Sequence, residues 1–362
     1  MDALVRVPMA AADPAMAPRR DPGAKLDHLA VCRSNAVEYC RSAGFDAYEF
    51  THQALPDIAL DAIDLTTSLL GKRLTAPLMV APMTGGTPAG HGINAQLAAA
   101  AERWGLGFAV GSQRVALEEE TRARWFKVRD VAPTLPLFAN LGAAQLVRGW
   151  GAREARRAVT MIAADALFIH LNPLQEAIQG GDVDFHGLHR QLAVLCRDLA
   201  SEGIPVYVRE VGFGLSPEAA AALVDCGVAG IDCAGAGGTS WAKVEALCTR
   251  DPRRRELGQQ FGEWGIATSR SIRNVRRGSP DLPLIATGGL RSGHDVAKAL
   301  ALGADIAALA RPFLVAATQG EEAIDRLLAN LIDGLRICMF GIGARNLAQL
   351  RNTPHLQPSQ AP

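Results

Sequence analysis

Short hydrophobic segments rich in strand-forming residues recur along the chain, with helical patterns between them. Intervening stretches such as Asn94–Trp104, Ala152–Ala163 and Pro217–Asp225 carry hydrophobic residues at spacings of three and four. Glycine or proline marks many of the junctions. The pattern predicts eight strands, at Pro77–Ala81, Gly107–Val110, Leu137–Ala139, Ala166–His170, Val206–Arg209, Ala229–Asp232, Leu284–Ala286 and Ile306–Leu309.

Eight strand–helix units in one chain indicate an α/β protein with a (β/α)₈ TIM barrel. A doubly wound open sheet is the alternative, because closure of a sheet leaves no mark in a sequence. We expect residues 1–24 to form a flexible N-terminal arm and residues 351–362 a disordered tail. Residues 25–350 would form the barrel, with an N-terminal extension (25–75) that packs a helix and a hairpin against its outside or bottom. The long connection Cys233–Pro283 would carry its own helix over the site.

Charge and composition narrow the class of protein. The 37 basic and 37 acidic side chains give a formal net charge of zero, which argues against a bulk binder of nucleic acid or membrane surfaces. No hydrophobic run approaches the roughly 20 residues that span a bilayer, and the N-terminus lacks the hydrophobic core of a secretory signal. The seven scattered cysteines form no C-x-x-C pair, which favours reduced thiols in a cytoplasmic protein.

Residues that directly follow barrel strands line the active-site face, so these positions are the main test for function. In this chain nearly every predicted strand ends in small or polar residues. The segments are Pro82–Gly86, Gly111–Arg114, Asn140–Ala143, His170–Glu176, Arg209–Gly214, Ala234–Trp241, Thr287–Gly293 and Ala310–Phe313.

Two glycine-rich turns, after the sixth and seventh strands, indicate a phosphate site. Glycine lets main-chain N–H groups approach an anion closely, and a following helix contributes a favourable N-terminal dipole. Thr239 could add a hydroxyl donor, and Arg291 or Arg311 a cation. The alternative is that the glycines serve only to form the turns and bind no ligand, but barrels often bind phosphate at this position. The G-x-G-x-x-G order of a dinucleotide site is absent.

The segment HLNPLQE carries the best catalytic candidates. His170 and Asn172 alternate with Leu171, so both side chains can point into the barrel mouth. Glu176, next to the neutral amide of Gln175, suits Mg²⁺ that already carries substrate phosphates. The alternative is a helix start with a hydrogen-bonded, buried histidine.

Other polar or aromatic residues near strand ends have two interpretations each. Arg114 and Arg209 could contact an anion or simply face solvent. Trp241 could be a lid or a core residue. Asp182 and Asp184 could bind a metal, but we favour a solvated loop.

Read in chain order, these segments resemble the type 2, FMN-dependent isopentenyl-diphosphate isomerases from about Lys25 to Leu350. The matching segments are MTGG, Ile93–Asn94, GSQ, NLGA, HLNPLQE, EVGFG, AGAGGTSW, TGGLRSG and ALALGAD. The resemblance implies a cytoplasmic homo-oligomer, a tetramer or octamer, that interconverts isopentenyl and dimethylallyl diphosphate in isoprenoid biosynthesis. It also implies reduced FMN, Mg²⁺ and NADPH as reductant.

The resemblance also implies roles for individual residues. Substrate would be bound by Lys25, His28, Arg114 and Gln175; Gln175 and His170 would be catalytic, and Glu176 would hold Mg²⁺. FMN would be bound by Met83, Thr84, Gly85, Ser112, Asn140, Arg209, Ala234, Thr239, Gly289, Arg291, Ala310 and Arg311.

Two departures from the family pattern leave the substrate open. Ala24 stands where the family has arginine, and Arg209 where it has lysine. A divergent FMN-dependent barrel enzyme acting on another substrate, as oxidoreductase or isomerase, is therefore the alternative. An oxidase of 2-hydroxy acids would need a histidine that the segment Ala234–Trp241 lacks. A non-catalytic flavin-binding barrel would not need His170, Gln175 and Glu176 together.

Overall fold

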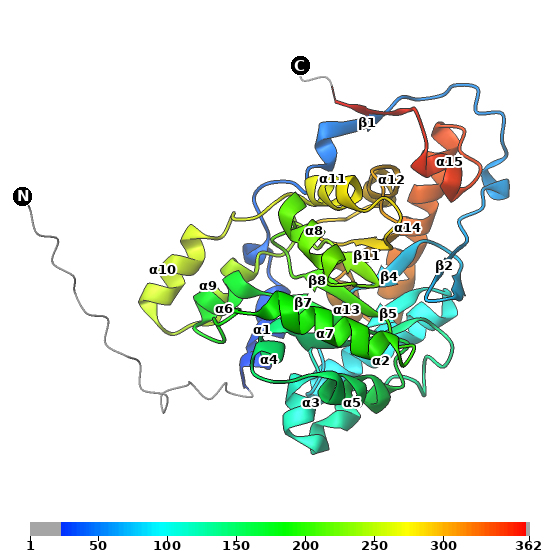
Figure 1. The fold of residues 1–362 in the computed structure, drawn as a ribbon. Coiled ribbons are helices and arrows are strands. Elements are labelled where there is room, and N and C mark those ends of the chain that lie inside the picture. Colours follow the sequence, from blue (N-terminus) through cyan, green and yellow to red (C-terminus); the bar gives the residue numbers. More distant parts are fainter. Residues whose placement is uncertain (1–22, 360–362) are drawn as a thin grey trace, which may run out of the picture.

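A closed barrel of eight parallel strands forms the centre of the computed structural model, which describes residues 23–359 of the 362, with side chains from His28 onward (Figure 1). The barrel closes where β11 pairs with β4. All eight predicted strands are confirmed, and the open sheet is excluded. The strands are β4 (Leu78–Val80), β5 (Gly107–Ala109), β6 (Leu137–Gly142), β7 (Ala166–Leu171), β8 (Val206–Glu210), β9 (Gly230–Asp232), β10 (Leu284–Ala286) and β11 (Ile306–Leu309).

Alternate residues of each strand point into the barrel or out toward the helices, as the pleat requires. On β7, Phe168 lies inside while Leu167 and Ile169 face the helical layer. Phe168 stacks on Phe138 with ring centroids 4.3 Å apart, and Tyr207 meets both rings edge-on. Each buried ring contributes about 2–3 kcal/mol from removal of its apolar surface from water.

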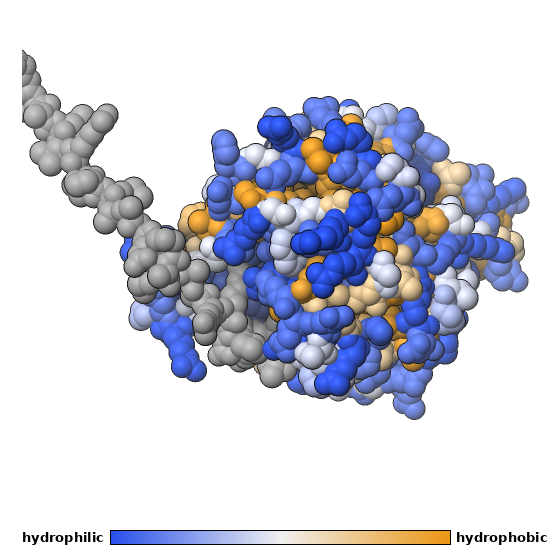
Figure 2. Space-filling model, turned by 60° about the horizontal axis from the view of Figure 1, so that its bottom comes forward, coloured by the Kyte–Doolittle hydropathy of each residue, from blue (hydrophilic) through white to orange (hydrophobic). Residues whose placement is uncertain are grey.

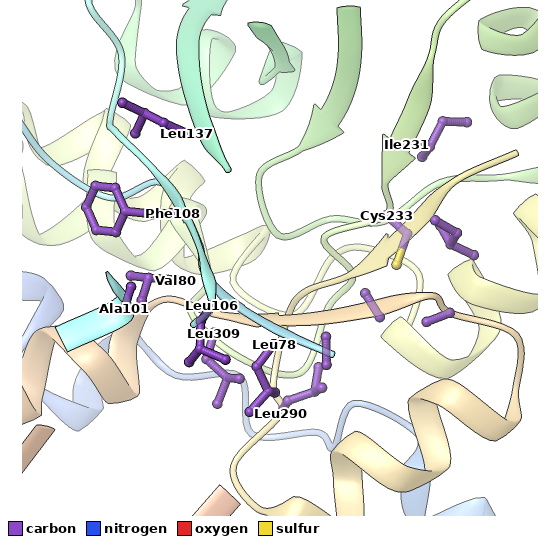
Figure 3. Close-up of a cluster of buried hydrophobic side chains, with 14 of the residues drawn as sticks. Leu78, Val80, Ala101, Leu106, Phe108, Leu137, Ile231, Cys233, Leu290 and Leu309 are labelled. Atoms are coloured by element: carbon purple, nitrogen blue, oxygen red, sulfur yellow. The ribbon is translucent and has the colours of Figure 1, made fainter. Parts of the chain in front are cut away.

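Helices surround the barrel and bury its outward side chains. Figure 3 shows Leu78, Val80 and Leu309 of neighbouring strands gathered with Ala101 of α2. The longer outer helices are α2 (Pro88–Arg103), α5 (Ala152–Ile162), α7 (Leu188–Ala200), α8 (Pro217–Asp225), α11 (Thr268–Gly278), α12 (Gly293–Ala301), α13 (Arg311–Gln319) and α14 (Glu321–Gly341). The others are α3 (Arg114–Glu118), α4 (Ala143–Val147), α6 (Pro173–Gln179), α9 (Trp241–Cys248), α10 (Pro252–Gln260) and α15 (Leu347–Arg351).

The bottom of the barrel, where the strands begin, is closed by the hairpin of β2 (Thr67–Leu69) and β3 (Lys72–Leu74), as expected. Leu69 and Leu74 pack on the side chains of the barrel interior. On the face shown in Figure 2, hydrophilic residues cover most of the surface and hydrophobic residues form small groups between them. No helix in the described part of the chain is long and apolar enough to cross a membrane.

The start of the N-terminal extension lies at the opposite end of the barrel, where we had expected only the outside or bottom. Helix α1 (Gly23–Cys32) packs on α9, and the short 3-10 helix η2 (Asn35–Val37) follows (Figure 1). Tyr39 N–H donates to Gly238 O at 2.9 Å and Ser240 N–H to Val37 O at 2.8 Å. These main-chain bonds to a strand-end turn hold the segment at the mouth, which a hydrophobicity pattern does not reveal.

The tail expected to be disordered is partly ordered. Strand β12 (Leu356–Pro358) pairs antiparallel with β1 (Tyr48–Phe50). Ser359 N–H also donates to Ala47 O at 2.9 Å. Proline is compatible with this two-stranded pairing at an edge, so the proline-rich composition misled the prediction. The flexible arm predicted for 1–24 lies almost wholly outside the described residues.

Candidate active site

A cavity of about 840 Å³ opens at the carboxyl ends of the barrel strands. Most predicted site residues line it, although they come from all eight strand ends and the N-terminal extension. They are His28, Met83, Thr84, Ser112, Arg114, Asn140, His170, Gln175, Glu176, Arg209, Ala234, Thr239, Gly289, Arg291, Ala310 and Arg311. Gly85 lies outside the lining and packs against Phe126. The side chain of Lys25 is outside the described residues.

The glycine-rich turns after β9 and β10 form one end of the cavity. They pack so closely that a Cβ atom on Gly289 would lie 2.5 Å from Gly237 O, and Gly289 has a left-handed φ of +75°. The N–H groups of Gly289 and Leu290 make no hydrogen bond within the described chain. Helix α13 begins directly after β11, and the N–H groups of Arg311 and Phe313 make no hydrogen bond to any described residue. This end can therefore bind a phosphate group through main-chain donors.

The Arg311 side chain, expected to contact phosphate, instead binds the N-terminal segment. Its Nε donates to Cys32 O at 2.9 Å, and Nη2 donates to Arg33 O and to Asn35 Oδ1. Nη1 forms an ion pair with Glu38. Arg291 makes fewer contacts with the N-terminal segment than Arg311 does: its Nη2 lies 3.4 Å from the Glu38 carboxylate.

A buried ion pair lies on the floor of the cavity. Arg209 Nε donates to Asp232 Oδ2 at 3.0 Å, and the two side chains are 9% and 1% exposed. Asp232 Oδ1 also accepts from Thr287 Oγ1 at 2.5 Å and from Ala234 N–H at 3.2 Å. The Nη groups of Arg209 make no hydrogen bond within the described part of the chain, and the residue lines the cavity. The pair therefore fixes a guanidinium whose donors are available to a ligand.

His170, at the end of β7, has a defined tautomer. Asn140 Nδ2 donates to Val110 O at 3.2 Å, so its Oδ1 faces His170 Nδ1 at 2.8 Å. An amide oxygen only accepts, so Nδ1 carries a proton and donates it to Asn140. The expected histidine at the mouth is thus held by a partner from the neighbouring strand.

A polar network connects α6 with α9. Asn172 Nδ2 donates to Glu176 Oε1 at 2.9 Å and to Gln175 Oε1 at 3.3 Å. Gln175 Nε2 donates to Glu245 Oε1 at 2.7 Å. Proline at the first position of α6 fixes the helix start that places these side chains side by side. The network orients both the Gln175 amide and the Glu176 carboxylate.

His28 of α1 faces this network. Its Nε2 lies 3.4 Å from Glu245 Oε1, and its ring meets Trp241 edge-on at 5.5 Å. Burial alone would lower the pKa of His28, but hydrogen bonds with Cys248 and Glu245 raise it from 6.5 to about 10. His28 is therefore a cation at neutral pH. Trp241, for which the sequence predicts either a lid or a core residue, packs beside His28.

The loop after β8 is shaped by Glu210. Its Oε2 accepts hydrogen bonds from four successive N–H groups, at Val211, Gly212, Phe213 and Gly214. Burial raises the pKa of Glu210 to about 7, and these four bonds oppose the shift. The EVGFG segment owes its form to this carboxyl group.

Sequence reasoning missed Glu245 and Asp232. Glu245 lies within helix α9 and Asp232 is the last residue of strand β9, so neither is at a loop position. An acidic residue within a hydrophobic run was the available signal. The interpretation of Asp182 as loop solvation was wrong: it forms an ion pair with Arg148, and its N–H donates to Glu176 Oε2 at 2.9 Å. Asp184 does remain a loop residue that accepts from His186 N–H.

The chain is similar to a described protein family and to several solved structures. A family described as FMN-dependent dehydrogenase matches residues 28–133 and 197–358. Solved structures with the same fold include a chimera of (S)-mandelate dehydrogenase, with a TM-score of 0.62 and 18% identity over 92% of this chain and 99% of that one. A protein of Pediococcus acidilactici described as a "(Putative)lactate oxidase" gives a TM-score of 0.60 and 19% identity, over 92% of this chain and 95% of that one. At these identities the structures show the fold alone.

Closer relatives in sequence carry a single name. The isopentenyl-diphosphate delta-isomerase of a Synechococcus species is 49% identical over 93% of this chain and 97% of its own length. That of Xanthobacter autotrophicus is 48% identical over 91% and 96%, and that of Methanosarcina barkeri 45% over 91% and 90%. The chain therefore belongs to the FMN-dependent isopentenyl-diphosphate delta-isomerase family.

Proposed function

We propose that this protein interconverts isopentenyl and dimethylallyl diphosphate, using reduced FMN and Mg²⁺ with NADPH as reductant. The observation that carries the proposal is the network of Asn172, Gln175, Glu176 and Glu245, which shares one cavity with the phosphate-binding turns. One end of the cavity suits the phosphate of FMN, and the other suits a substrate diphosphate. A cytoplasmic location and a homo-oligomer rest on the family resemblance alone.

The residues of the cavity fit FMN. The glycine turns supply main-chain donors for its phosphate, and Arg209 presents Nη donors from the floor. When bound in its reduced form, FMN supplies an electron-rich ring that stabilises positive charge developing on the alkene. Arg209 is suited to the pyrimidine edge, because a guanidinium offers two parallel donors where lysine offers a point charge.

The residues also fit Mg²⁺ that arrives with the substrate. No cluster of three or more His, Cys, Asp or Glu side chains that could hold a metal occurs among the described residues. Mg²⁺ is commonly bound by one or two carboxylates together with substrate phosphates. Glu176 is 3% exposed and is oriented by Asn172 Nδ2 and the Asp182 N–H. It would hold the ion against the diphosphate.

Isomerisation adds a proton to the terminal methylene carbon and removes one from the carbon adjoining the diphosphate-bearing methylene. Gln175 would face the alkene, with Glu245 fixing the orientation of its amide through Nε2. His170 would present its Nε2, since Nδ1 donates to Asn140. His28, protonated at neutral pH, would attract the diphosphate. The hydrophobic ring of Trp241 would exclude water from the reacting carbons.

Oxidation of a 2-hydroxy acid is less compatible with this cavity. The turn after β9 carries Thr239 and Trp241 but no histidine. Among the described residues that line the cavity, the histidines are His28 and His170, and His170 is bonded to an amide. A base for abstracting the hydroxy-acid proton is therefore lacking at that turn.

The test is an isomerase assay with the purified full chain, in which complete reactions are compared with reactions that lack one component. Anaerobic protein with FMN, dithionite or NADPH, and Mg²⁺ should convert isopentenyl diphosphate, and omission of any one component should stop the reaction. Titration with FMN should give a yellow complex. A protein that ignores FMN, or that works oxidised and metal-free, would overturn the proposal.

A further inference from the structure

The guanidinium of Arg311 lies between the phosphate end of the cavity and the N-terminal segment. We infer that Arg311 is a positioning residue: it holds the end of helix α1, and through α1 it places His28 at the substrate site. This inference rests on the proposed function for its substrate. It assigns the side chain to the N-terminal segment rather than to FMN phosphate.

The hydrogen bonds of Arg311 support this assignment. Four of the five N–H donors of the guanidinium are engaged: Nε with Cys32 O, Nη1 with Glu38, and Nη2 with both Arg33 O and Asn35 Oδ1. All four acceptors belong to residues 32–38. The side chain is only 12% exposed. A phosphate would have to displace these partners and approach the Glu38 carboxylate, which repels an anion.

The position of these acceptors shows what is held. Cys32 is the last residue of α1, so Arg311 satisfies the carbonyl groups that a helix end leaves unpaired. The residues that follow α1 are held in place by other contacts, since the main chain of Glu38 forms an antiparallel β-bridge with Thr239. Lys243 Nζ also donates to Glu38 O at 2.7 Å. Arg311 thus connects this anchored part to the helix that carries His28.

The same residue contributes to the phosphate end through its main chain. Arg311 is the first residue of α13, so its N–H belongs to the helix start that faces the cavity. Backbone and side chain therefore serve different sites. A substitution of Arg311 keeps its main-chain N–H and changes only the side-chain bonds that fix the end of α1.

The test compares Arg311→Lys with wild type in the FMN-loaded full chain. Lysine keeps the charge but cannot make the four bonds, so α1 should be less well held. We expect KM for isopentenyl diphosphate to rise about tenfold with little change in kcat, and the FMN Kd to stay within about threefold. Cleavage by trypsin after Arg33 should also become faster, a readout that does not depend on turnover.

Two further variants complete the test. Glu38→Gln removes the charge of one partner and should shift KM and proteolysis in the same direction by a smaller factor. Arg276→Lys is the matched control: it alters another arginine that is held by several hydrogen bonds, here at the bottom of the barrel, and should leave KM and cleavage after Arg33 unchanged.

A tenfold weaker FMN Kd with unchanged KM and proteolysis in Arg311→Lys would identify the side chain as a phosphate ligand and overturn the inference. Unchanged values for all three would overturn it too. If wild type binds FMN but does not isomerise the substrate, the proposed function fails. FMN affinity and proteolysis still decide the role of Arg311 in that case.

Discussion

The two ends of the barrel use arginine differently. At the bottom, Arg129 and Arg276 each donate to main-chain carbonyl groups and pair with an aspartate, Asp165 at 2.6 Å and Asp305 at 2.5 Å. Each aspartate also accepts from the first N–H of the preceding barrel strand, β6 or β10. The same arrangement thus recurs four strands apart and ties neighbouring strands together.

At the top, Arg209 pairs with Asp232 through Nε only, and its other donors face the cavity. Arginines that donate to the protein through Nε and both Nη groups contribute to stability, whereas an arginine whose Nη groups make no bond to the protein can bind a ligand. By this criterion Arg311 resembles the bottom arginines although it lies at the top. Position at the mouth is therefore not enough to identify a ligand-binding side chain.

Among these variants, we expect Glu176→Gln to have the largest effect on turnover. Loss of the carboxylate that would hold Mg²⁺ should lower turnover by at least about 100-fold, or raise the Mg²⁺ requirement strongly, while FMN stays bound. Steady-state rates over a Mg²⁺ series measure this. Asp184→Asn, which changes an exposed loop acid nearby, is the control and should behave as wild type. An unchanged Mg²⁺ dependence would exclude the role of Glu176.

At the bottom, Arg276→Met should cost stability and spare function. It removes the arginine donor from Asp305 and from several carbonyl groups, at a cost of about 2–4 kcal/mol in the free energy of unfolding. Urea unfolding checks this value. The kcat and KM of the folded protein should match wild type. A raised KM without loss of stability would contradict the division between the two ends.

Asp232→Asn, at the ion pair with Arg209, should change the redox potential of bound FMN more than it changes the stability of the fold. The neutral side chain leaves the charge of Arg209 uncompensated, which favours the anionic reduced flavin. We expect the two-electron potential of bound FMN to rise by about 30 mV, equal to ~1.4 kcal/mol. Anaerobic titration against a reference dye measures it. A potential equal to that of wild type would show that Arg209 and Asp232 do not contact the flavin.

The smallest expected effect is the pH dependence of stability that His28 causes. The pKa of His28 rises from 6.5 to about 10 in the folded protein, so its protonated form stabilises the fold fully below about pH 6.5. This contribution is lost as the pH rises toward 10. The Tm difference between wild type and His28→Gln should therefore shrink between pH 6.5 and 10. A difference that grows over this range would contradict the assigned charge.

Local patterns in the sequence were sufficient for the barrel and for most of its mouth. Strand periodicity gives the eight strands, and the rule that strand ends face the site brings His170, Gln175 and Glu176 to one cavity. Long-range partners could not be predicted in this way. Glu245 meets Gln175 from a helix 70 residues away, and nothing in its local sequence indicates that contact.

The chain ends show the same limit. The composition of the tail indicated disorder, but β12 finds its partner in β1, about 300 residues earlier. The role of the Arg311 side chain likewise depends on the path of residues 32–38. Sequence reasoning placed Arg311 at the correct end of the barrel, and only the structure shows which of its neighbours the side chain binds.

The proposed isomerase activity can be tested directly by following isopentenyl diphosphate with proton NMR in D₂O. The wild-type chain is incubated anaerobically with reduced FMN and Mg²⁺. We predict dimethylallyl diphosphate that carries deuterium in a methyl group, because the new proton comes from solvent-exchanging groups of the site. Recovery of unchanged isopentenyl diphosphate from the FMN-loaded, reduced protein would contradict it.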